Sequence, residues 1–428
     1  MIGYGDSIKG LNDASRDIRI SSLKRLKEGM DQGKIPYPKG MGYINNHIHT
    51  TYSFSPYSPS KAIWMAVNAG LATAGIMDHD TISGAEEFIE AGRIMGMATT
   101  IGIECRVDFS KTPIGGRRIN NPDQDGIAYI ALHGIPHTQI QKVKDFFAPY
   151  TVERNRRNRG MTQNINRIFK PFGIELDFFR DIVPISQHRD GGSITERHLL
   201  FALSKKLVQA FGKGQGLVDF LIHKMDIEIK PSTLEHLLDK DNVFYEYDLL
   251  GLLKSDLVEK IYIDATDECP DVREVISLSR NIGAISAYAY LGDVGDSVTG
   301  DKRTQKFEDD YLVLLFEVIK DLGFDAVTYM PTRNTMEQLI SIKDLCLEYD
   351  LFEISGEDIN SPRQSFVCKA LDNPIFENLF DSTWALIGHE IAATGDLSSG
   401  MFTRDTIRKY PNLQERIAVY KKIGMEGR

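Results

Sequence analysis

The sequence predicts an α/β fold in which about seven strand and helix units form an incomplete or distorted barrel. Short β-rich runs alternate with helix-like stretches, a pattern typical of a mainly parallel sheet. A mostly helical segment interrupts this alternation, which then resumes. Polar residues of metal-ligand type follow the ends of several predicted strands, where parallel α/β barrels place their functional groups. These three observations indicate one barrel with an inserted, mainly helical subdomain.

The predicted strands are short, as is usual for a sheet of this kind. They cover residues 43–49, 73–78, 98–104, 127–133, 284–288, 326–330 and 352–355. Helices are predicted between strands where apolar residues recur at helical spacing, at residues 59–68, 83–95, 307–322 and 335–349. About seven units suit a barrel better than an open sheet.

A chain of 428 residues exceeds one compact core of ordinary size, so we expect one elaborated domain or two. The insertion is placed to cover the mouth of the barrel. The predicted bounds are 1–40 for an N-terminal helical arm, 41–150 and 283–375 for the two parts of the barrel, 151–282 for the helical insertion and 376–428 for a C-terminal helical segment. Helices are predicted at 17–32 in the arm and at 155–172, 195–211 and 231–239 in the insertion.

Composition places the chain among globular proteins, with 42% hydrophobic and 26% charged residues. Its net charge of −10 argues against a general nucleic-acid surface. No apolar stretch approaches the roughly 20 residues of a membrane span, and the first residues do not resemble a signal peptide. The four cysteines show no CxxC spacing, so we expect neither a zinc knuckle nor a disulfide framework, and a cytoplasmic location.

The most informative pattern is His47-Ile48-His49 at the end of the first predicted strand. Residues two apart on a strand point to the same side, so both imidazoles project together and form half of a divalent-metal site. The alternative is a pair of ordinary strand histidines. Ligand-type residues at or beyond later strand ends favour the metal site: Asp78, His79, Asp80, Glu104, His133 and Asp358. For Asp78 and Asp80, capping of the next helix is the competing role.

Three segments carry a family resemblance: residues 47–53, 75–85 and 101–105. In order and spacing they closely resemble the PHP superfamily, named for bacterial DNA polymerase and histidinol phosphatase. The resemblance covers residues 41–135, with weaker echoes at 195–200 and 284–360. The helical insertion resembles that of the stand-alone phosphoesterases of this family. The resemblance implies a distorted (β/α)7 TIM-like barrel that binds up to three divalent metal ions and hydrolyses phosphate esters.

Matched position by position, the resemblance implies one complete metal site and two incomplete ones. His47, His49, Glu104 and Asp358 supply the complete site, His133 belongs to a second site that shares Glu104, and His79 to a third. Three residues depart from the pattern where the family usually has a ligand: Phe54, Tyr288 and Asn360. Nitrogen and oxygen ligands without thiolate suit Zn²⁺, Mn²⁺ or Fe²⁺, so we expect one to three such ions per chain.

Other residues are expected to serve catalysis or substrate binding. Asp78 is expected to orient an imidazole. Tyr288 is expected to fill the vacant ligand place or to donate a hydrogen bond to phosphate. Arg333 and the pair Arg197 and His198 are the predicted phosphate contacts, because guanidinium matches phosphate with paired donors. The remaining candidates are Asn360 as a substrate contact, and Asp293, Asp296 and Asp301, for which a polar loop is favoured over a role as substitute metal ligands. Arg154, Arg156, Arg157 and Arg159 are expected to form a solvated helix face, with nucleic-acid contact as the alternative.

The predicted function is hydrolysis of a phosphate ester of a small metabolite or nucleotide by metal-activated water, without a covalent intermediate. We expect no membrane partner, and nucleic acid only as a nucleotide or short oligonucleotide substrate. The first alternative is a degenerate PHP barrel that binds metal or ligand and regulates without hydrolysis, which Phe54, Tyr288 and Asn360 favour. The second is metal-assisted hydrolysis of a C–N or carboxylic ester bond.

Overall fold

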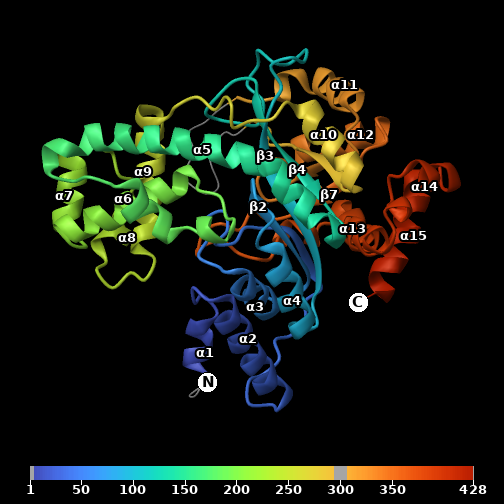
Figure 1. Cartoon of the computed structure of the whole chain (residues 1–428), viewed down its shortest axis with the longest axis horizontal. Coiled ribbons are helices and arrows are strands. Elements are labelled where there is room, and N and C mark those ends of the chain that lie inside the picture. The colour runs from blue at the N-terminus through green and yellow to red at the C-terminus, as the bar shows by residue number, and fades with distance from the viewer. Residues whose placement is uncertain (1–3, 294–305, 428) are drawn as a thin grey trace.

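The computed structural model describes residues 4–293 and 306–427 and contains one curled, seven-stranded mixed sheet in an α/β arrangement (Figure 1). The strands lie in sequence order, so each pairs with its neighbours along the chain. They are β1 (Tyr43–Ile48), β2 (Leu71–His79), β3 (Ala98–Asp108), β4 (Ile127–His133), β5 (Ile285–Ala289), β6 (Ala326–Tyr329) and β7 (Phe352–Ser355).

The direction of β4 differs from the prediction of a mainly parallel run through the sheet. β4 is antiparallel to both β3 and β5, whereas the other four neighbouring pairs are parallel. The connection from β3 to β4 contains no helix, so nothing in it carries the chain back to the starting end of the sheet. The following segment, from β4 to β5, leaves and rejoins the sheet at the same end of these two neighbouring strands, because His133 pairs with Ile285.

The two edges of the curled sheet meet at β1 and β7. Ile48 and Ile359 form an isolated parallel bridge. The His49 amide donates to the Ile359 carbonyl at 3.0 Å, and the Ile359 amide donates to the His47 carbonyl at 3.1 Å. The Asn46 side chain adds a bond to the Ser355 carbonyl at 2.8 Å. These few bonds bring the segment after β7 against the end of β1.

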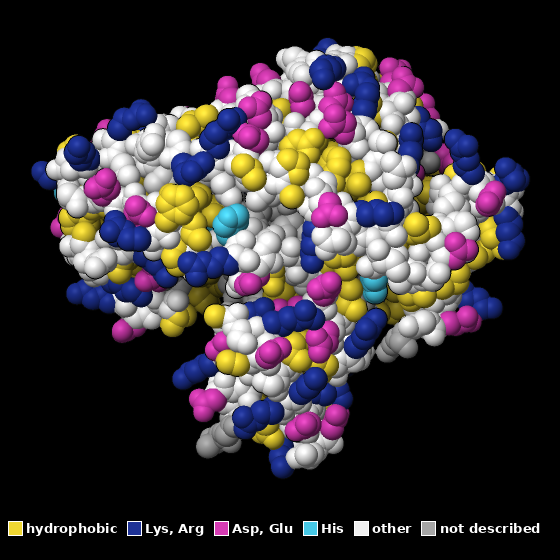
Figure 2. Space-filling model, viewed as in Figure 1, with side chains coloured by type: hydrophobic (Ala, Val, Ile, Leu, Met, Phe, Trp, Pro, Cys, Tyr) yellow, Lys and Arg dark blue, Asp and Glu magenta, His cyan; other side chains and the backbone are white. Residues whose placement is uncertain are grey.

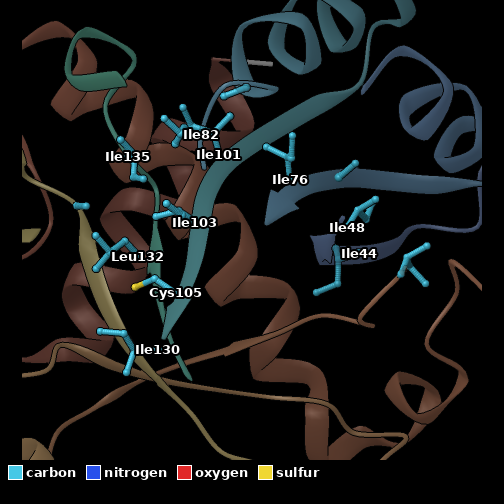
Figure 3. Packing of buried hydrophobic residues seen from close by; sticks show 14 of the residues in the cluster. Ile44, Ile48, Ile76, Ile82, Ile101, Ile103, Cys105, Ile130, Leu132 and Ile135 are labelled. Atoms are coloured by element: carbon cyan, nitrogen blue, oxygen red, sulfur yellow. The ribbon is translucent and has the colours of Figure 1, made fainter. Parts of the chain in front are cut away.

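The outer face of the sheet carries the main hydrophobic core. Figure 3 shows Ile44 and Ile48 of β1, Ile76 of β2, Ile103 of β3 and Ile130 of β4 among its members. Alternate residues of each strand point to this face, as expected for a half-buried β pattern. The core is completed by α3 (Pro59–Asn68), α4 (Ala85–Met95), α10 (Val272–Ile282), α11 (Leu312–Leu322) and α12 (Met336–Glu348).

The inner face of the sheet is partly filled by α13 (Glu377–Gly395), which contacts β1, β3 and β7 and packs against α15 (Leu413–Glu426). Small side chains at Ala131, Ala287 and Ala326 belong to this inner cluster and leave room for the helix. Thr383 of α13 accepts a hydrogen bond from Asn46 at 2.8 Å. The helix is therefore held one residue away from the predicted metal ligand His47.

The first five α-helices between β4 and β5, called the β4–β5 helices, surround a second hydrophobic cluster and extend to one side of the sheet (Figure 1). They are α5 (Ile140–Phe169), α6 (Glu196–Phe211), α7 (Gln215–His223), α8 (Pro231–Leu238) and α9 (Tyr245–Ile261). α5 begins 15 residues before the predicted helix and continues through Pro149, although proline ordinarily interrupts a helix. The predicted domain boundaries stay a prediction.

The remaining helices flank the sheet at the two ends of the chain. α1 (Gly5–Gly10) and α2 (Arg16–Asp31) pack near α3 and α4, with buried Arg19 donating to Glu87 at 2.9 and 2.5 Å. α14 (Arg404–Lys409) precedes α15. None of the helices in the described ranges has the length and hydropathy of a membrane span.

A buried ionic network fastens the β4–β5 helices to the sheet. Arg106 of β3 binds Glu196 at 3.1 Å and Glu268 at 2.7 Å. Arg157 of α5 binds Glu196 at 2.7 Å, and Arg154 binds Asp80. The prediction of a solvated basic face is therefore wrong for Arg154 and Arg157, which are 3% and 7% exposed. Their charges are compensated by buried carboxylates, as burial of an arginine requires.

We expect Glu268→Ala to lower the free energy of unfolding by about 3–5 kcal/mol, because the three buried arginines would then share two carboxylates, Asp80 and Glu196. Asp267→Ala is the matched control, since it removes an exposed carboxylate that pairs with Arg156 at 2.8 Å and should change stability by less than about 1 kcal/mol. Urea unfolding of both variants measures the difference. Equal, small losses would contradict a stabilising network.

Candidate metal centre

Four side chains from three distant segments converge where β1 meets β7. The His47 and His49 Nε2 atoms lie 3.2 Å apart. Glu104 Oε2 of β3 lies 3.4 Å from His47 Nε2 and 3.7 Å from His49 Nε2. Asp358 Oδ1, just beyond β7, lies 3.1 Å from His49 Nε2. Alternation along the strands explains the convergence, because Ile48 and Ile103 point to the outer core while their neighbours point inward.

Two further histidines flank Glu104. His79, at the end of β2, pairs in register with Glu104, and its Nδ1 lies 3.1 Å from Glu104 Oε2. His133 of β4 lies on the same face as Ala131, the residue paired with Glu104. Both ring nitrogens of His133 are buried without a hydrogen-bond partner among the described residues. An isolated imidazole of this kind is rare in a folded interior and calls for a ligand.

The electrostatics of the cluster keep its carboxylates charged. Burial alone would raise the pKa of Glu104, but the neighbouring His79 and His47 hold it lower, at about 2. Burial would also raise the pKa of Asp358, but the neighbouring His49, His47 and Arg197 hold it well below its ordinary value. Burial lowers the pKa of both His79 and His133 to about 3, so these rings are neutral at pH 7. Neutral imidazole and ionised carboxylate are the forms that bind metal.

The donor set fits a divalent cation. His47, His49 and Glu104 each offer a ligand atom within 4.8 Å of the others. Two ligands about 2.1 Å from one ion at a tetrahedral angle lie roughly 3.4 Å apart, close to the distances observed here. The three residues are nearly buried, whereas the Asp358 and His79 side chains are 34% and 25% exposed, so the cluster opens to solvent on their side.

The PHP domain family matches residues 45–311, which is more than half of the chain. The chain belongs to the PHP domain family. The match begins two residues before His47 and includes the β4–β5 helices. No curated protein matches the chain.

Two solved structures are similar to this PHP protein. A protein from Bifidobacterium adolescentis, provisionally assigned as a metal-dependent phosphoesterase, superposes with a TM-score of 0.50 and 17% sequence identity, over 77% of this chain and 94% of that one. An amidohydrolase from Chromobacterium violaceum, with bound sulfate and no metal, gives a TM-score of 0.48 and 16% identity, over 76% of this chain and 90% of that one. At such identities the first likeness shows a shared fold.

The structure contradicts the role predicted for Tyr288. Tyr288 pairs with Ile130 of β4 and belongs to the outer hydrophobic core, so its ring points away from the face that carries Glu104 and His133. Its hydroxyl donates to Glu308 at 3.2 Å, and burial raises its pKa well above the ordinary value. The inward-facing position of β5 at this level is Ala287, which has no ligand atom.

Asp78 does not face the metal cluster either. It precedes His79 and points to the opposite face of the sheet, where it accepts hydrogen bonds at 2.6 Å from the Thr50 amide, the Thr50 hydroxyl and the Ser53 hydroxyl. It therefore holds the loop after β1 and takes no direct part in the site. Ser53 in turn contacts His49 Nδ1 at 3.3 Å, so the imidazole that Asp78 orients is His49, through Ser53.

The predicted substrate contacts divide into two groups. His198 is 1% exposed, and its Nδ1 accepts a bond from the Thr195 amide at 3.0 Å as part of the α6 cap, so a substrate role is not supported. The Asn360 side-chain Nδ2 donates to Asp358 Oδ1 at 2.7 Å and so positions a metal ligand instead of a substrate. Arg197, by contrast, is close enough to Asp358 to lower its pKa.

Other candidates remain predictions. The segment that carries Arg333 lies beside the site, because neighbouring Thr332 donates to Glu357 at 2.8 and 2.7 Å. Asp293 is occupied by the Phe307 amide at 2.6 Å, while Asp296 and Asp301 lie outside the described residues. Sequence reasoning missed Ser53 and Arg106. Ser53 stands four residues after His49, but only the fold brings Asp78 beside it.

The buried histidines predict a loss of stability in acid for the metal-free protein. The pKa of His133 falls from 6.5 to about 3 on folding. Below pH 6.5 the unfolded chain therefore binds a proton that the folded chain does not, and the free energy of unfolding decreases as the pH falls towards 3. One such proton contributes a slope of up to about 1.4 kcal/mol per pH unit.

We expect His133→Gln to reduce this slope, measured by urea unfolding between pH 6.5 and 4.5 in the presence of chelator. His223→Gln, at an exposed position, is the control and should leave the slope as it is in the unmodified protein. A slope that His133→Gln does not alter would show that this ring is protonated normally in the folded state.

Proposed function

We propose that this PHP protein is a metal-dependent hydrolase that cleaves a phosphate ester of a small metabolite or nucleotide by activated water. The observation that carries the proposal is that His47, His49 and Glu104 each place a ligand atom within 4.8 Å of the others, with Asp358 Oδ1 3.1 Å from His49 Nε2. Two imidazoles and two carboxylates offer the nitrogen and oxygen ligands that suit a divalent cation. Membership of the PHP family supports the same conclusion.

His47, His49, Glu104 and Asp358 would hold the first ion, and Glu104 with His79 and His133 would hold a second. When bound, a divalent cation polarises a phosphate oxygen and lowers the pKa of water towards 7. The residues of the chain keep the carboxylates ionised, hold His79 and His133 neutral and exclude bulk water from the buried side. The half-exposed side at Asp358 and His79 gives the substrate access.

Arg197 supplies positive charge at this open side. It lies at the second position of α6 and acts on Asp358, and no hydrogen bond or ion pair to it is found among the described residues. A guanidinium with unused donors beside a metal cluster suits the non-bridging oxygens of a phosphate. On the face drawn in Figure 2, acidic and basic side chains are interspersed, which favours a small substrate over an extended nucleic acid.

An active hydrolase and a regulatory PHP barrel differ in metal content and in turnover of phosphate esters. His49→Ala should lower metal affinity by more than about 100-fold and abolish hydrolysis of p-nitrophenyl phosphate. It removes the imidazole that lies beside both His47 and Asp358. Elemental analysis and turnover of the same preparations measure both. His389→Ala, a buried histidine whose Nδ1 accepts from the Met401 amide at 2.9 Å, is the control and should retain metal.

Unchanged metal content in His49→Ala would contradict the assigned site. Metal bound by the unmodified protein without turnover of any phosphate ester would favour the regulatory barrel. Hydrolysis of p-nitroanilide or carboxylic ester substrates in place of phosphate esters would favour metal-assisted hydrolysis of a C–N or carboxylic ester bond.

Arg197→Gln should raise the KM for p-nitrophenyl phosphate by about 10-fold or more, because a charge-assisted hydrogen bond to phosphate is lost. Metal content should stay the same. Lys205→Gln, on the same helix and over the Phe201 ring, is the matched control and should leave the KM unchanged. If both variants behave alike, Arg197 does not contact the substrate.

A further inference from the structure

The loop after β1, residues 50–54, is held from the side of the sheet by Asp78. This carboxylate is 1% exposed and accepts three hydrogen bonds from the loop, each 2.6 Å long. Both of its oxygens are used, Oδ1 by the Thr50 amide and the Ser53 hydroxyl and Oδ2 by the Thr50 hydroxyl. A buried carboxylate with a full set of donors fixes the backbone around it.

Ser53 passes this constraint on to His49. Its single hydroxyl proton is donated to Asp78, so its oxygen can only accept from His49 Nδ1, which lies 3.3 Å away. This arrangement selects the tautomer with the proton on Nδ1. The lone pair of Nε2 then points toward His47 and Asp358, where a cation would bind.

Phe54 holds the same loop from the side of the β4–β5 helices. Its φ is 112°, an unfavourable conformation for a bulky residue that persists only where the surroundings enforce it. The ring belongs to the second hydrophobic cluster and meets His198 and Phe201 edge-on, at centroid distances of 5.0 and 5.5 Å. Aromatic packing on α6 therefore compensates for the strained backbone.

The segment that precedes α6 also bonds directly to the loop after β1 and to the end of β2. The Ser193 amide donates to the Tyr52 carbonyl at 2.7 Å, and the Ser193 hydroxyl donates to the His79 carbonyl at 2.6 Å. The loop after β1 is thus clamped between the sheet and the segment that precedes α6.

We propose that residues 50–54 are a positioning loop that couples the docking of the β4–β5 helices to the orientation of His49, with Phe54 as the anchor and Ser53 as the residue that orients the ring. This inference rests on the proposed metal site. It explains how a position where the family usually has a metal ligand can carry a phenylalanine: in this chain the residue acts on the ligand set through the loop.

The first test compares Ser53→Ala with Ser60→Ala. Ser60 is also fully buried and also donates to a buried carboxylate, Glu87, at 2.6 Å, but it has no contact with the metal ligands. Ser53→Ala should weaken Mn²⁺ binding to the full chain by about 10- to 100-fold, as loss of an outer hydrogen-bond partner of a ligand does. Ser60→Ala should leave Mn²⁺ affinity unchanged while lowering the unfolding midpoint comparably.

A second readout reports the ring itself. In the metal-free, histidine-labelled protein, ¹⁵N spectra should show His49 with its proton on Nδ1, and Ser53→Ala should give a mixture of tautomers. Equal Mn²⁺ affinities in Ser53→Ala and the unmodified protein, or an unchanged tautomer, would overturn the positioning role. An unmodified protein that binds no Mn²⁺ would overturn the proposed function together with this inference.

The anchor is tested with Phe54→Gly and Phe54→Leu. Glycine adopts a positive φ without strain but lacks the ring. It should therefore weaken Mn²⁺ binding several-fold, although the backbone strain is relieved. Leucine, which retains apolar packing, should have a smaller effect and serves if the glycine variant does not fold. Phe169→Leu, in the same cluster and fully buried, is the control and should keep its affinity. Wild-type affinity in both Phe54 variants would contradict the coupling.

Discussion

The meeting of β1 with β7 is the constraint on which the site depends. His49 and Asp358 are separated by more than 300 positions in the sequence, yet their side chains lie 3.1 Å apart because the backbone bonds between His47, His49 and Ile359 close the sheet upon itself. An open sheet with the same strands would leave the carboxylate at one edge and the imidazoles at the other. Closure therefore creates the ligand set, and the strand sequences supply its members.

The alternation of side chains decides which residues can use that closure. One face of each strand supplies isoleucine and leucine to the outer core, and the other supplies the ligands and the small alanines beneath α13. A shift of one residue along a strand moves a side chain from one face of the sheet to the other. Tyr288 and Asp78 illustrate this, because each lies next to an inward-facing position and each is committed to hydrogen bonds elsewhere.

Much of the fold could be predicted from local pattern. The strands at 127–133 and 352–355 and the helix at 59–68 have the predicted bounds, because periodicity and flanking turns report local structure. The direction of β4 could not be predicted, since it depends on pairing between distant strands. For the site, His47, His49 and Glu104 were recognisable from spacing and family motif and lie together in the structure. The buried roles of Arg154 and Arg157 were not, because their acidic partners come from three separate segments.

The reversed β4 has a consequence for α5. Since β4 ends beside the start of β5, the intervening chain leaves and re-enters the sheet at the same end of these strands. α5, with 30 residues or a length of about 45 Å, carries the chain away from that end. Val143 and Phe147 of this helix join the outer core, whereas Met161 and Ile165 join the second cluster. The helices α6 to α9 that follow surround the second cluster, and α10 returns the chain to the outer core. A change in the length of α7 or α8, which pack on α6 and α9 within this segment, would leave the pairing of the seven strands intact.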